Sequence, residues 1–540
     1  MKKFTEKHHK KRFLESVYKN AIQLILVGAV TGILVSLVLT FFNILAHEAE
    51  EIARVGYAYV RANPAFLPLL VVTLLIGAFL LAVALRISTI AKGCGIPQAE
   101  GAARGAIRFR WWSDAVTMFA ASLLSIFMGL SIGAEGPSVL IGACLGDGVA
   151  ATLRRDEMIK RYQITGGACT GLAVASNAPL TGIVFAFEEA HKRFTPEVFI
   201  CSFVSVIFGM ITRSVIYSAL GKEIESAFHS YVFHALPITA YGYVVIAGVI
   251  CGLLGVAFFK ASFAVRRLFK RIKLKNHVWN ESSRIFIGVL LGGLISLLAA
   301  GVMGGGHTLI ENLGTLGGAV KPTTESVFGL PLLWSLFVIL VLKFLVTNIN
   351  VGSGIPCGIF IPIIAIGACV GALLNGTFIA LGMDEKYADL MIMICMASFF
   401  ATVVRAPLTA VIMICEFTGS FAPLLPIIIA VAIGFIIGDV SRTDGIYEEL
   451  LEVYEQENGI HERAVREVYE ITLTHGAIAE GREVRDVLWP SGVRVVEIHR
   501  GEEVILPDGD TVLHGGDILK MACKTDSPER VKDELVHILG

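Results

Sequence analysis

The chain has 540 residues, a mean hydropathy of +0.71 and only 17% charged residues, whereas a soluble globular protein has about a quarter. Its net charge of −1 argues against nucleic-acid binding by bulk electrostatics. The ten cysteines are scattered without a CxxC pair, which argues against a disulfide framework and a zinc site. The strongly apolar part ends near residue 440, so we expect a membrane domain followed by a small soluble domain.

The N-terminus, residues 1–20, carries a cluster of lysine, arginine and histidine residues, and the apolar run Ala21–Phe42 follows it. A run of about 20 apolar residues spans the hydrocarbon core of a bilayer. Because no small-residue cleavage site follows, a signal peptide is not expected. By the positive-inside rule, the basic cluster predicts a cytoplasmic N-terminus.

Further apolar segments recur as far as residue 437, and several are too short to cross a bilayer alone. Each short segment is opened or interrupted by glycine and proline; they are Ser138–Ala151, Pro179–Phe187, Ile359–Leu374 and Pro407–Cys415. Backbone can break inside a membrane only where protein buries it or a polar cavity receives it. Short broken segments in matching halves point to the binding site of a transporter.

The two halves of the apolar part repeat each other. Ala178-Pro179-Leu180-Thr181 is echoed 228 residues later by Ala406-Pro407-Leu408-Thr409, and Glu188 and Glu416 follow at the same distance. A second pair begins at Gly136-Pro137 and Ile361-Pro362, with an offset of 225 residues. Two matches in the same order at nearly one offset predict a duplicated membrane unit.

Three Gly/Pro clusters stand before helix-like segments: Gly93–Pro97, Gly133–Pro137 and Gly358–Pro362. Glycine lets backbone approach a ligand, and proline suits the first turn of a helix. A helix N-terminus offers free N–H groups and a partial positive charge, so several such ends would bind an anion. The alternative for each cluster alone is tight helix packing by small residues. Three clusters together, two of them within the repeat, favour the anion site.

Two glutamates among the apolar segments are candidates for proton chemistry. Glu135 lies inside the second cluster, where a carboxylate costs several kcal/mol unless it is paired, protonated or hydrated. Its carboxylate would compete with an anion for the same N–H groups, and protonation would release it. Glu189 ends the apolar run from Pro179. The alternative for Glu189 is a carboxylate at a helix end in water.

The last hundred residues have the pattern of a small α/β domain. Residues 448–467 are rich in glutamate at helical spacing and predict an acidic helical linker, and residues 468–540 form the predicted domain. The expected strands are Tyr469–Leu473, Val493–His499, Glu503–Leu506 and Asp517–Cys523. The segment Pro528–Leu539 has the pattern of an amphipathic terminal helix.

The apolar part, residues 21–447, resembles the CLC family of chloride channels and chloride/proton exchangers. Gly93–Pro97 is similar to that family's GSGIP motif, Gly133–Pro137 to its GREGP motif and Gly358–Pro362 to its GxFxP motif. Tyr447 resembles the tyrosine whose hydroxyl contacts the central anion. The resemblance implies an all-α polytopic membrane domain with an inverted repeat of broken helices, and a homodimer with one pore per subunit.

The resemblance also implies roles for individual residues. Glu135 would be the gating glutamate and Glu189 the inner proton-transfer glutamate of an exchanger. The expected anion-binding residues are Cys94, Gly95, Ile96, Gly133, Ala134, Gly136, Ile359, Phe360 and Tyr447.

Three positions depart from the family pattern. Cys94 stands where a serine is usual, Ala134 where an arginine is frequent, and Met118 where a buried lysine is common. A thiol is a weaker hydrogen-bond donor than a hydroxyl, so the preference among chloride, bromide, nitrate and fluoride stays open. The fluoride-exporting branch also departs at the central serine, but it generally lacks the inner glutamate.

The tail resembles the C-terminal subdomain of potassium-conductance regulators, the RCK-C or TrkA-C type. The residues that carry this likeness are Val493–Arg500, Val504–Pro507, Gly509–Val512 and Gly515–Leu519. Such domains dimerise and often bind a small regulatory ligand, cyclic di-AMP in some cases. The alternative is a dimerisation module without a ligand.

We therefore expect a multi-pass protein of the cell membrane, with both termini cytoplasmic, that exchanges chloride for protons. The alternatives are a passive chloride channel and a fluoride/proton antiporter. A membrane-anchored ligand sensor would not need costly broken helices, and no TVGYG-like potassium filter is present. No enzymatic activity is expected, because Cys94, His307 and the acids form no nucleophile–base spacing. No cofactor or metal is expected either. His307 is expected to be a loop residue.

Overall fold

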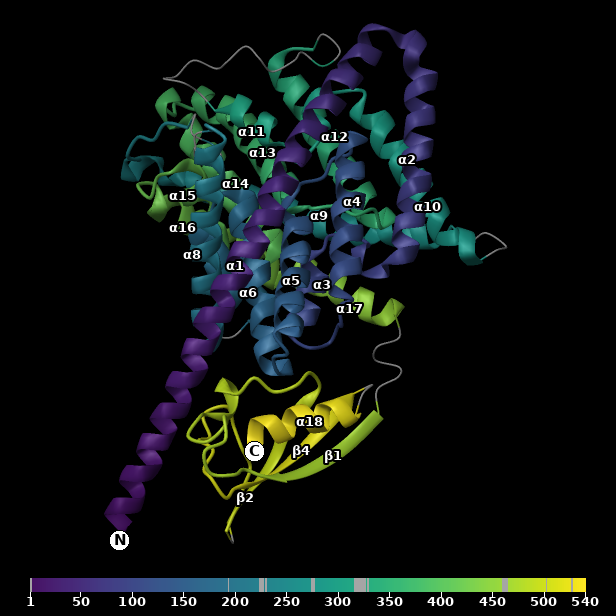
Figure 1. Cartoon of the computed structure of the whole chain (residues 1–540). Coiled ribbons are helices and arrows are strands. Elements are labelled where there is room, and N and C mark those ends of the chain that lie inside the picture. Colours follow the sequence, from purple (N-terminus) through teal and green to yellow (C-terminus); the bar gives the residue numbers. More distant parts are fainter. Residues whose placement is uncertain are drawn as a thin grey trace.

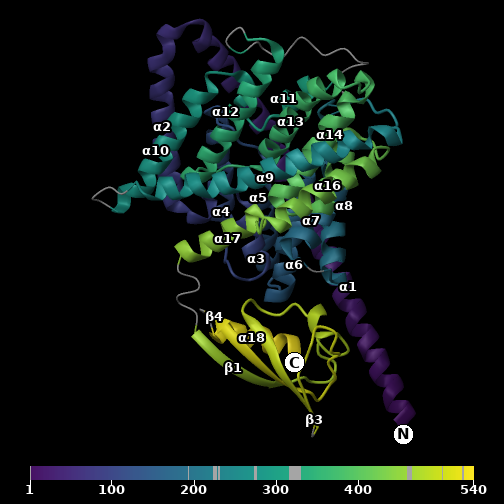
Figure 2. The ribbon, with the colours of Figure 1, turned by 180° about the vertical axis from the view of Figure 1, so that it is seen from behind.

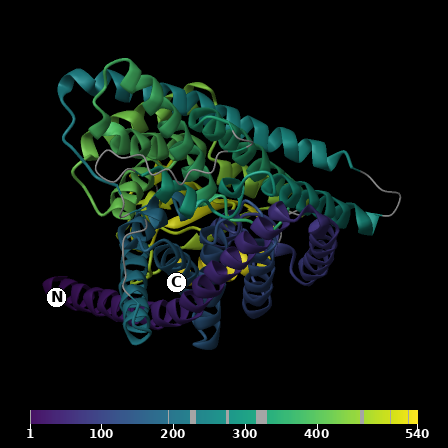
Figure 3. The same ribbon diagram turned by 90° about the horizontal axis from the view of Figure 1, so that it is seen from above.

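The computed structural model describes residues 2–192, 194–222, 228, 231–272, 277–314, 327, 330–458, 465–501, 503–525 and 528–540. Its larger part is a bundle of helices, and a small sheet domain lies against one end of the bundle (Figure 1). In the view from above, the strands of this domain are seen beneath the helices (Figure 3).

The helical part has the following bounds: α1 (Lys2–Ala62), α2 (Leu67–Ile87), α3 (Ile96–Ala103), α4 (Trp111–Phe127), α5 (Glu135–Thr152), α6 (Glu157–Ser176), α7 (Pro179–Phe185), α8 (Pro196–Ala219), α9 (Tyr241–Lys270), α10 (His277–Ser296), α11 (His307–Leu313), α12 (Leu332–Ser353), α13 (Phe360–Ala380), α14 (Ala388–Val404), α15 (Pro407–Thr418), α16 (Leu424–Val440) and α17 (Ile446–Glu457). Seven helical segments in the described part of the chain are long and apolar enough to cross a membrane.

Burial in the bundle follows the distribution of apolar residues. Every residue of α14 is buried, and this helix packs against α9, α13 and α16, as expected of a helix that is apolar all round. The outer helices α1, α2 and α8 expose many large apolar side chains. Such surfaces suit contact with lipid, since lipid tails are as apolar as the side chains.

The repeat seen in the sequence appears as two matching sets of helices, α5–α7 and α13–α15. The helices α6 and α14 each end in a left-handed residue, Asn177 with φ +53° and Arg405 with φ +70°. In both sets an Ala-Pro pair then starts the next helix. These matching breaks confirm the predicted duplication.

Two glutamates join the repeats by capping each other's helices. The Glu416 carboxylate accepts from the N–H groups of Leu180 and Thr181 at the start of α7, both at 2.7 Å. The Glu188 carboxylate accepts from Leu408 N–H at 2.8 Å and Thr409 N–H at 2.6 Å, at the start of α15. Each repeat therefore supplies the anionic cap for a helix of the other.

The C-terminal domain is a four-stranded antiparallel sheet in the order β1-β4-β2-β3. Its elements are β1 (Val465–Thr472), β2 (Val493–Arg500), β3 (Glu503–Ile505), β4 (Ile518–Thr525) and α18 (Pro528–Leu539). They agree with the predicted strands to within a few residues and with the predicted terminal helix.

The predicted helical linker does not extend to residue 467. The helix α17 ends at Glu457, and residues 465–467 already belong to β1. The physical reason is that Val465, Glu467 and their neighbours pair residue by residue with β4. A cross-strand ladder then outweighs the helical preference of glutamate.

The C-terminal domain contacts the ends of α6 and α8 (Figure 2). Arg482 forms an ion pair with Glu197 of α8. His537 Nε2 lies 3.5 Å from Asp156 Oδ2, and Arg161 of α6 donates to the Trp489 carbonyl at 3.4 Å. These contacts place the domain beneath one end of the helical bundle.

Candidate anion and proton site

The three Gly/Pro clusters meet in space, although they are far apart in the sequence. The helices α3, α5 and α13 begin at Ile96, Glu135 and Phe360. Gly133 N–H donates to the Gly358 carbonyl at 2.7 Å, and Cys357 N–H donates to the Gly93 carbonyl at 3.0 Å. Three helix N-termini, each with free N–H groups and a partial positive charge, therefore start around the same place.

Glycine is required where these loops touch. A Cβ on Gly136 would lie 2.3 Å from the Cys94 carbonyl oxygen, closer than any side chain tolerates. Gly95 has φ +89°, and Cε of Met118 lies 3.1 Å from the position that its Cβ would take. The methyl group of Met118 thus packs against the turn that carries Cys94.

Two side chains present hydrogen-bonding groups at the place where α3, α5 and α13 begin. The Cys94 sulfur lies within hydrogen-bonding range of the N–H groups of Ile96 and Ile359. The Tyr447 hydroxyl is buried and has no hydrogen-bond partner among the described residues. A buried polar group without a partner costs about 1–3 kcal/mol, and an anion that accepts from Tyr447 would remove this cost. The other residues predicted to bind the anion lie at the three helix starts: Gly95, Ile96, Gly133, Ala134, Gly136, Ile359 and Phe360.

Glu135 is the first residue of α5, and its side chain is buried at 1% exposure. Its Oε1 lies 3.1 Å from His307 Nε2, and its Oε2 has no hydrogen-bond partner among the described residues. The His307 side chain is 42% exposed, so its imidazole reaches from the buried carboxylate to the surface of the protein. The expectation of a loop residue is wrong, because His307 begins α11.

A buried lysine holds the loop that presents His307. Lys343 is fully buried, and its Nζ donates to the carbonyls of Val302 at 3.2 Å, Met303 at 3.4 Å and Gly304 at 2.8 Å. These carbonyls lie just before His307 in the chain. A lone lysine within an apolar run is the sequence signal that would have indicated this role.

Glu189 lies in a short π-helical turn, Ala186–Ala190, and is buried at 3% exposure. Its carboxyl group is within hydrogen-bonding range of the carboxyl group of Glu100, which is fully buried in α3. Neither oxygen of Glu100 accepts a hydrogen bond from an N–H or O–H group of the described residues, although Arg104 lies close enough for an ion pair. Two carboxylates in contact repel each other, and one shared proton turns the repulsion into a hydrogen bond.

Arg104 supports the contact between Glu100 and Glu189. Its Nη2 lies 3.7 Å from Glu100 Oε2 and donates to the Glu189 carbonyl at 3.0 Å. Its Nε donates to the Ala190 carbonyl at 3.3 Å. Glu100 and Arg104 were not predicted as site residues, although Glu100 follows the first Gly/Pro cluster by only three residues.

The two predicted proton-carrying glutamates lie toward opposite ends of the bundle. Glu135 contacts α11, whereas Glu189 is close to Lys192, which pairs with Glu448 of α17. The helix α17 lies at the end that faces the C-terminal domain, and α11 lies toward the other end (Figure 1). The Tyr447 side chain is within electrostatic range of both glutamates and of Cys94.

Two family models match this chain. The family model described as voltage gated chloride channel matches residues 76–439, and the TrkA-C domain model matches residues 468–536. An H(+)/Cl(-) exchange transporter, ClcA, of Vibrio vulnificus is 30% identical over 439 residues, which are 80% of this chain and 89% of the relative. Its counterpart in Vibrio cholerae is 28% identical over 443 residues, 80% of this chain and 90% of the relative.

Two solved structures are similar in fold. A slow cyanobacterial Cl-/H+ antiporter is 23% identical, with a TM-score of 0.70, and the match covers 81% of this chain and 99% of the antiporter. A CLC-type fluoride/proton antiporter is 21% identical, with a TM-score of 0.61. The match covers 79% of this chain and 97% of the antiporter. The protein is thus embedded in a membrane through several spans, with a TrkA-C domain at its C-terminal end. It belongs to the voltage gated chloride channel family.

Proposed function

We propose that this protein exchanges chloride for protons across the cell membrane. The observation that carries the proposal is a pair of buried acidic positions, Glu135 and Glu189, on either side of converging helix N-termini. The relatives that are named H(+)/Cl(-) exchange transporters support the same reaction.

In the proposed cycle, chloride binds between the starts of α3, α5 and α13, beside Cys94 and Tyr447. The ionised Glu135 carboxylate competes for the N–H groups at the start of α5, because they attract any anion. Protonation removes its charge and lets chloride pass. Glu189 delivers or receives the proton at the other end, and Glu100 shares that proton with it.

We also propose an orientation in the membrane and an oligomeric state. The basic N-terminal residues favour a cytoplasmic N-terminus, and both termini lie toward the same end of the bundle (Figure 1). We therefore place Glu189 at the cytoplasmic side and Glu135 at the outer side. The assembly is a homodimer with one pathway per subunit, and cross-linking of the full chain in membranes tests it.

The test uses purified protein in liposomes with an imposed chloride gradient, while external pH is recorded. Wild type is expected to move protons against their gradient. The variants Glu135→Gln and Glu189→Gln are expected to lose proton movement, with chloride flux retained in at least one. The exposed Glu385→Gln serves as a matched control. Chloride flux without proton movement in wild type would contradict exchange and leave a passive channel.

Fluoride/proton exchange is the second candidate, because Cys94 replaces a hydroxyl by a thiol at the anion site. The presence of Glu189 argues for chloride. Parallel flux measurements with chloride and fluoride decide between them, and a fluoride flux that exceeds chloride flux tenfold would favour the alternative.

The C-terminal domain is proposed to bind a small regulatory ligand, for which cyclic di-AMP is the first probe. To test this regulation, cyclic di-AMP is titrated into the full-length protein. Calorimetry measures its binding, and the chloride flux assay measures its effect on transport. If the domain only supports dimerisation, the titration should give neither a heat of binding nor a change in chloride flux.

A further inference from the structure

The loop before α11 covers the carboxylate of Glu135. A Cβ on Gly305 would lie 3.4 Å from the Cα of Gly133, and a Cβ on Gly133 would collide with Glu135 Oε2. The carboxylate therefore lies between the start of α5 and this loop, and the Glu135 residue is only 1% exposed. In this position, a proton from the surrounding water needs a carrier to reach the carboxylate.

His307 is a polar side chain that reaches through this cover. Its Nε2 lies 3.1 Å from Glu135 Oε1, while its side chain is 42% exposed. The ring of the buried Phe228 stands beside the imidazole, with 6.0 Å between the ring centroids. Lys343 holds the preceding loop through three of its carbonyls. The imidazole is therefore kept against the carboxylate on one side and meets water on the other.

A cavity of about 150 Å³ opens beside the same loop. It is lined by the residues on either side of His307 and by Glu50 and Arg54, among others. Arg54 is paired with Glu51, which offsets its charge. Glu50 adds negative charge near His307, and Lys343 adds positive charge. Because Glu135 and Glu50 both face the imidazole, the opposite charge favours its protonated form.

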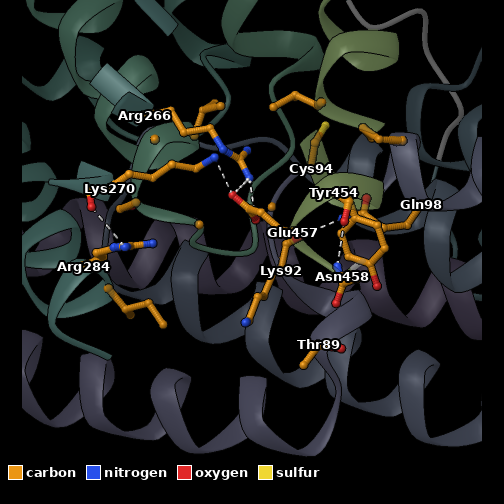
Figure 4. A pocket seen from close by; sticks show the side chains of 18 residues that line it. Thr89, Lys92, Cys94, Gln98, Arg266, Lys270, Arg284, Tyr454, Glu457 and Asn458 are labelled. Carbon is orange, nitrogen blue, oxygen red and sulfur yellow. Dashed lines mark hydrogen bonds and ion pairs between the residues drawn. The ribbon is translucent and has the colours of Figure 1, made fainter. Parts of the chain in front are cut away.

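The charge at the opposite end of the bundle is different. The cavity there has four basic side chains, Lys92, Arg266, Lys270 and Arg284, and Glu457 is the single carboxylate among its lining residues (Figure 4). A cleft lined mainly by positive charge repels protonated groups. The cavity beside α11 is therefore better suited to a group that takes up protons from water.

We propose that His307 is a proton relay, which takes each proton from water and passes it to Glu135. The inference rests on the proposed exchange of chloride for protons. The imidazolium donates its Nε2 proton to Glu135 Oε1, so that the carboxylate becomes neutral and the imidazole keeps its Nδ1 proton. The ring then turns Nε2 toward the surface, where it takes the next proton from water. One proton is taken up for each proton delivered, and the reverse sequence carries a proton out.

The experiment uses the full-length protein in liposomes with an imposed chloride gradient, while external pH is recorded. Proton movement in His307→Ala is expected to fall at least about tenfold, since a positioned acid–base group is lost. Imidazole, at equal concentration on both sides of the membrane, should restore proton movement severalfold, because it fits the vacated space and carries a proton. Pyrazole has the same size but is a much weaker base, and it should restore nothing. Wild type in the same solutions is the reference.

His307→Gln is the second variant, because it fills the space with a polar side chain that cannot carry a proton. It should lose proton movement as His307→Ala does, and imidazole should not restore it. Calorimetric titration with chloride checks that the anion site of both variants is intact. His234→Ala is the matched control, since it removes an exposed histidine elsewhere and should behave as wild type.

Three results would overturn the relay: a wild-type rate of proton movement in either variant of His307, equal restoration by imidazole and pyrazole, or no restoration of His307→Ala by imidazole. In each of these cases wild type still moves protons, and the proposed exchange stands. Absence of proton movement in wild type would instead contradict the exchange itself, and the relay with it.

Discussion

At the end of the bundle opposite the C-terminal domain, the half-exposed His307 imidazole lies 3.1 Å from the buried Glu135 carboxylate. A charged His307 would stabilise the ionised form of Glu135, since an opposite charge within about 4 Å favours the charged state of a carboxyl group. Glu50 and Glu311 add negative charge near this pair and Lys343 adds positive charge. If the proposed function holds, this pair is expected to make exchange sensitive to the pH of the bath at this end of the bundle.

The variant His307→Gln tests this sensitivity at the residue scale. Without the imidazole, Glu135 Oε1 loses its partner at 3.1 Å, and the positive charge that a protonated His307 places beside the carboxylate is gone. The midpoint of the external-pH dependence of exchange should then move upward by about half a unit to one unit. Exchange rates measured from external pH 5 to 8 give the midpoint. His234→Gln removes an exposed histidine and should behave as wild type; an unchanged midpoint in His307→Gln would contradict the pairing.

Cys94 offers a second residue-scale prediction, on anion selectivity. Its sulfur is buried beside the N–H groups of Ile96 and Ile359, and a hydroxyl is a better donor than a thiol. Cys94→Ser should therefore tighten chloride binding about twofold to fivefold. Calorimetric titration with chloride measures the change. Cys201→Ser is the control, because the Cys201 thiol already donates to the Tyr162 carbonyl at 3.1 Å, as a hydroxyl would.

At the scale of elements, the reciprocal caps hold the two repeats together. Glu188 and Glu416 each accept two backbone N–H groups at the start of a helix of the other repeat. A charged cap at a helix N-terminus contributes roughly 1–2 kcal/mol. Glu188→Gln and Glu416→Gln should each lower the thermal midpoint of the detergent-solubilised protein by a few degrees. Size-exclusion chromatography after heating measures this midpoint, and a midpoint equal to that of Glu385→Gln would contradict the capping role.

The starts and ends of helices were the features that could best be predicted from the sequence. The Ala-Pro pairs and the Gly/Pro clusters mark helix starts because proline and glycine restrict the backbone locally. The contacts of Glu100 with Glu189, and of Lys343 with the loop before His307, join segments distant in sequence. No spacing or local pattern reports such contacts, so they became visible only in the structure.

At the scale of the whole molecule, hydrogen bonds connect the C-terminal domain with the turn that carries Glu189. The Trp489 carbonyl accepts from Arg161, which also donates to the carbonyls of Ala103 and Arg104, both at 3.0 Å. Arg104 in turn binds the Glu189 carbonyl. The end of α3 is thus held between the C-terminal domain and the turn that carries Glu189.

Arg161→Gln tests whether this connection positions the inner glutamate. Arg161 is buried at 4% exposure, and loss of its charged hydrogen bonds costs about 1.5–3 kcal/mol each. The end of α3 should then loosen and misplace Arg104. The ratio of proton flux to chloride flux in liposomes is expected to fall severalfold, while chloride flux itself is largely retained.

Arg482→Gln distinguishes positioning of Glu189 from docking of the domain, because it removes the ion pair with Glu197 but leaves the bonds of Arg161 to α3. If the bonds to α3 matter, Arg482→Gln keeps the flux ratio of wild type. If docking alone matters, both variants lower the ratio equally. A wild-type ratio in Arg161→Gln would show that α3 holds Glu189 without help from Arg161, and the proton pathway would then be independent of the domain beneath it.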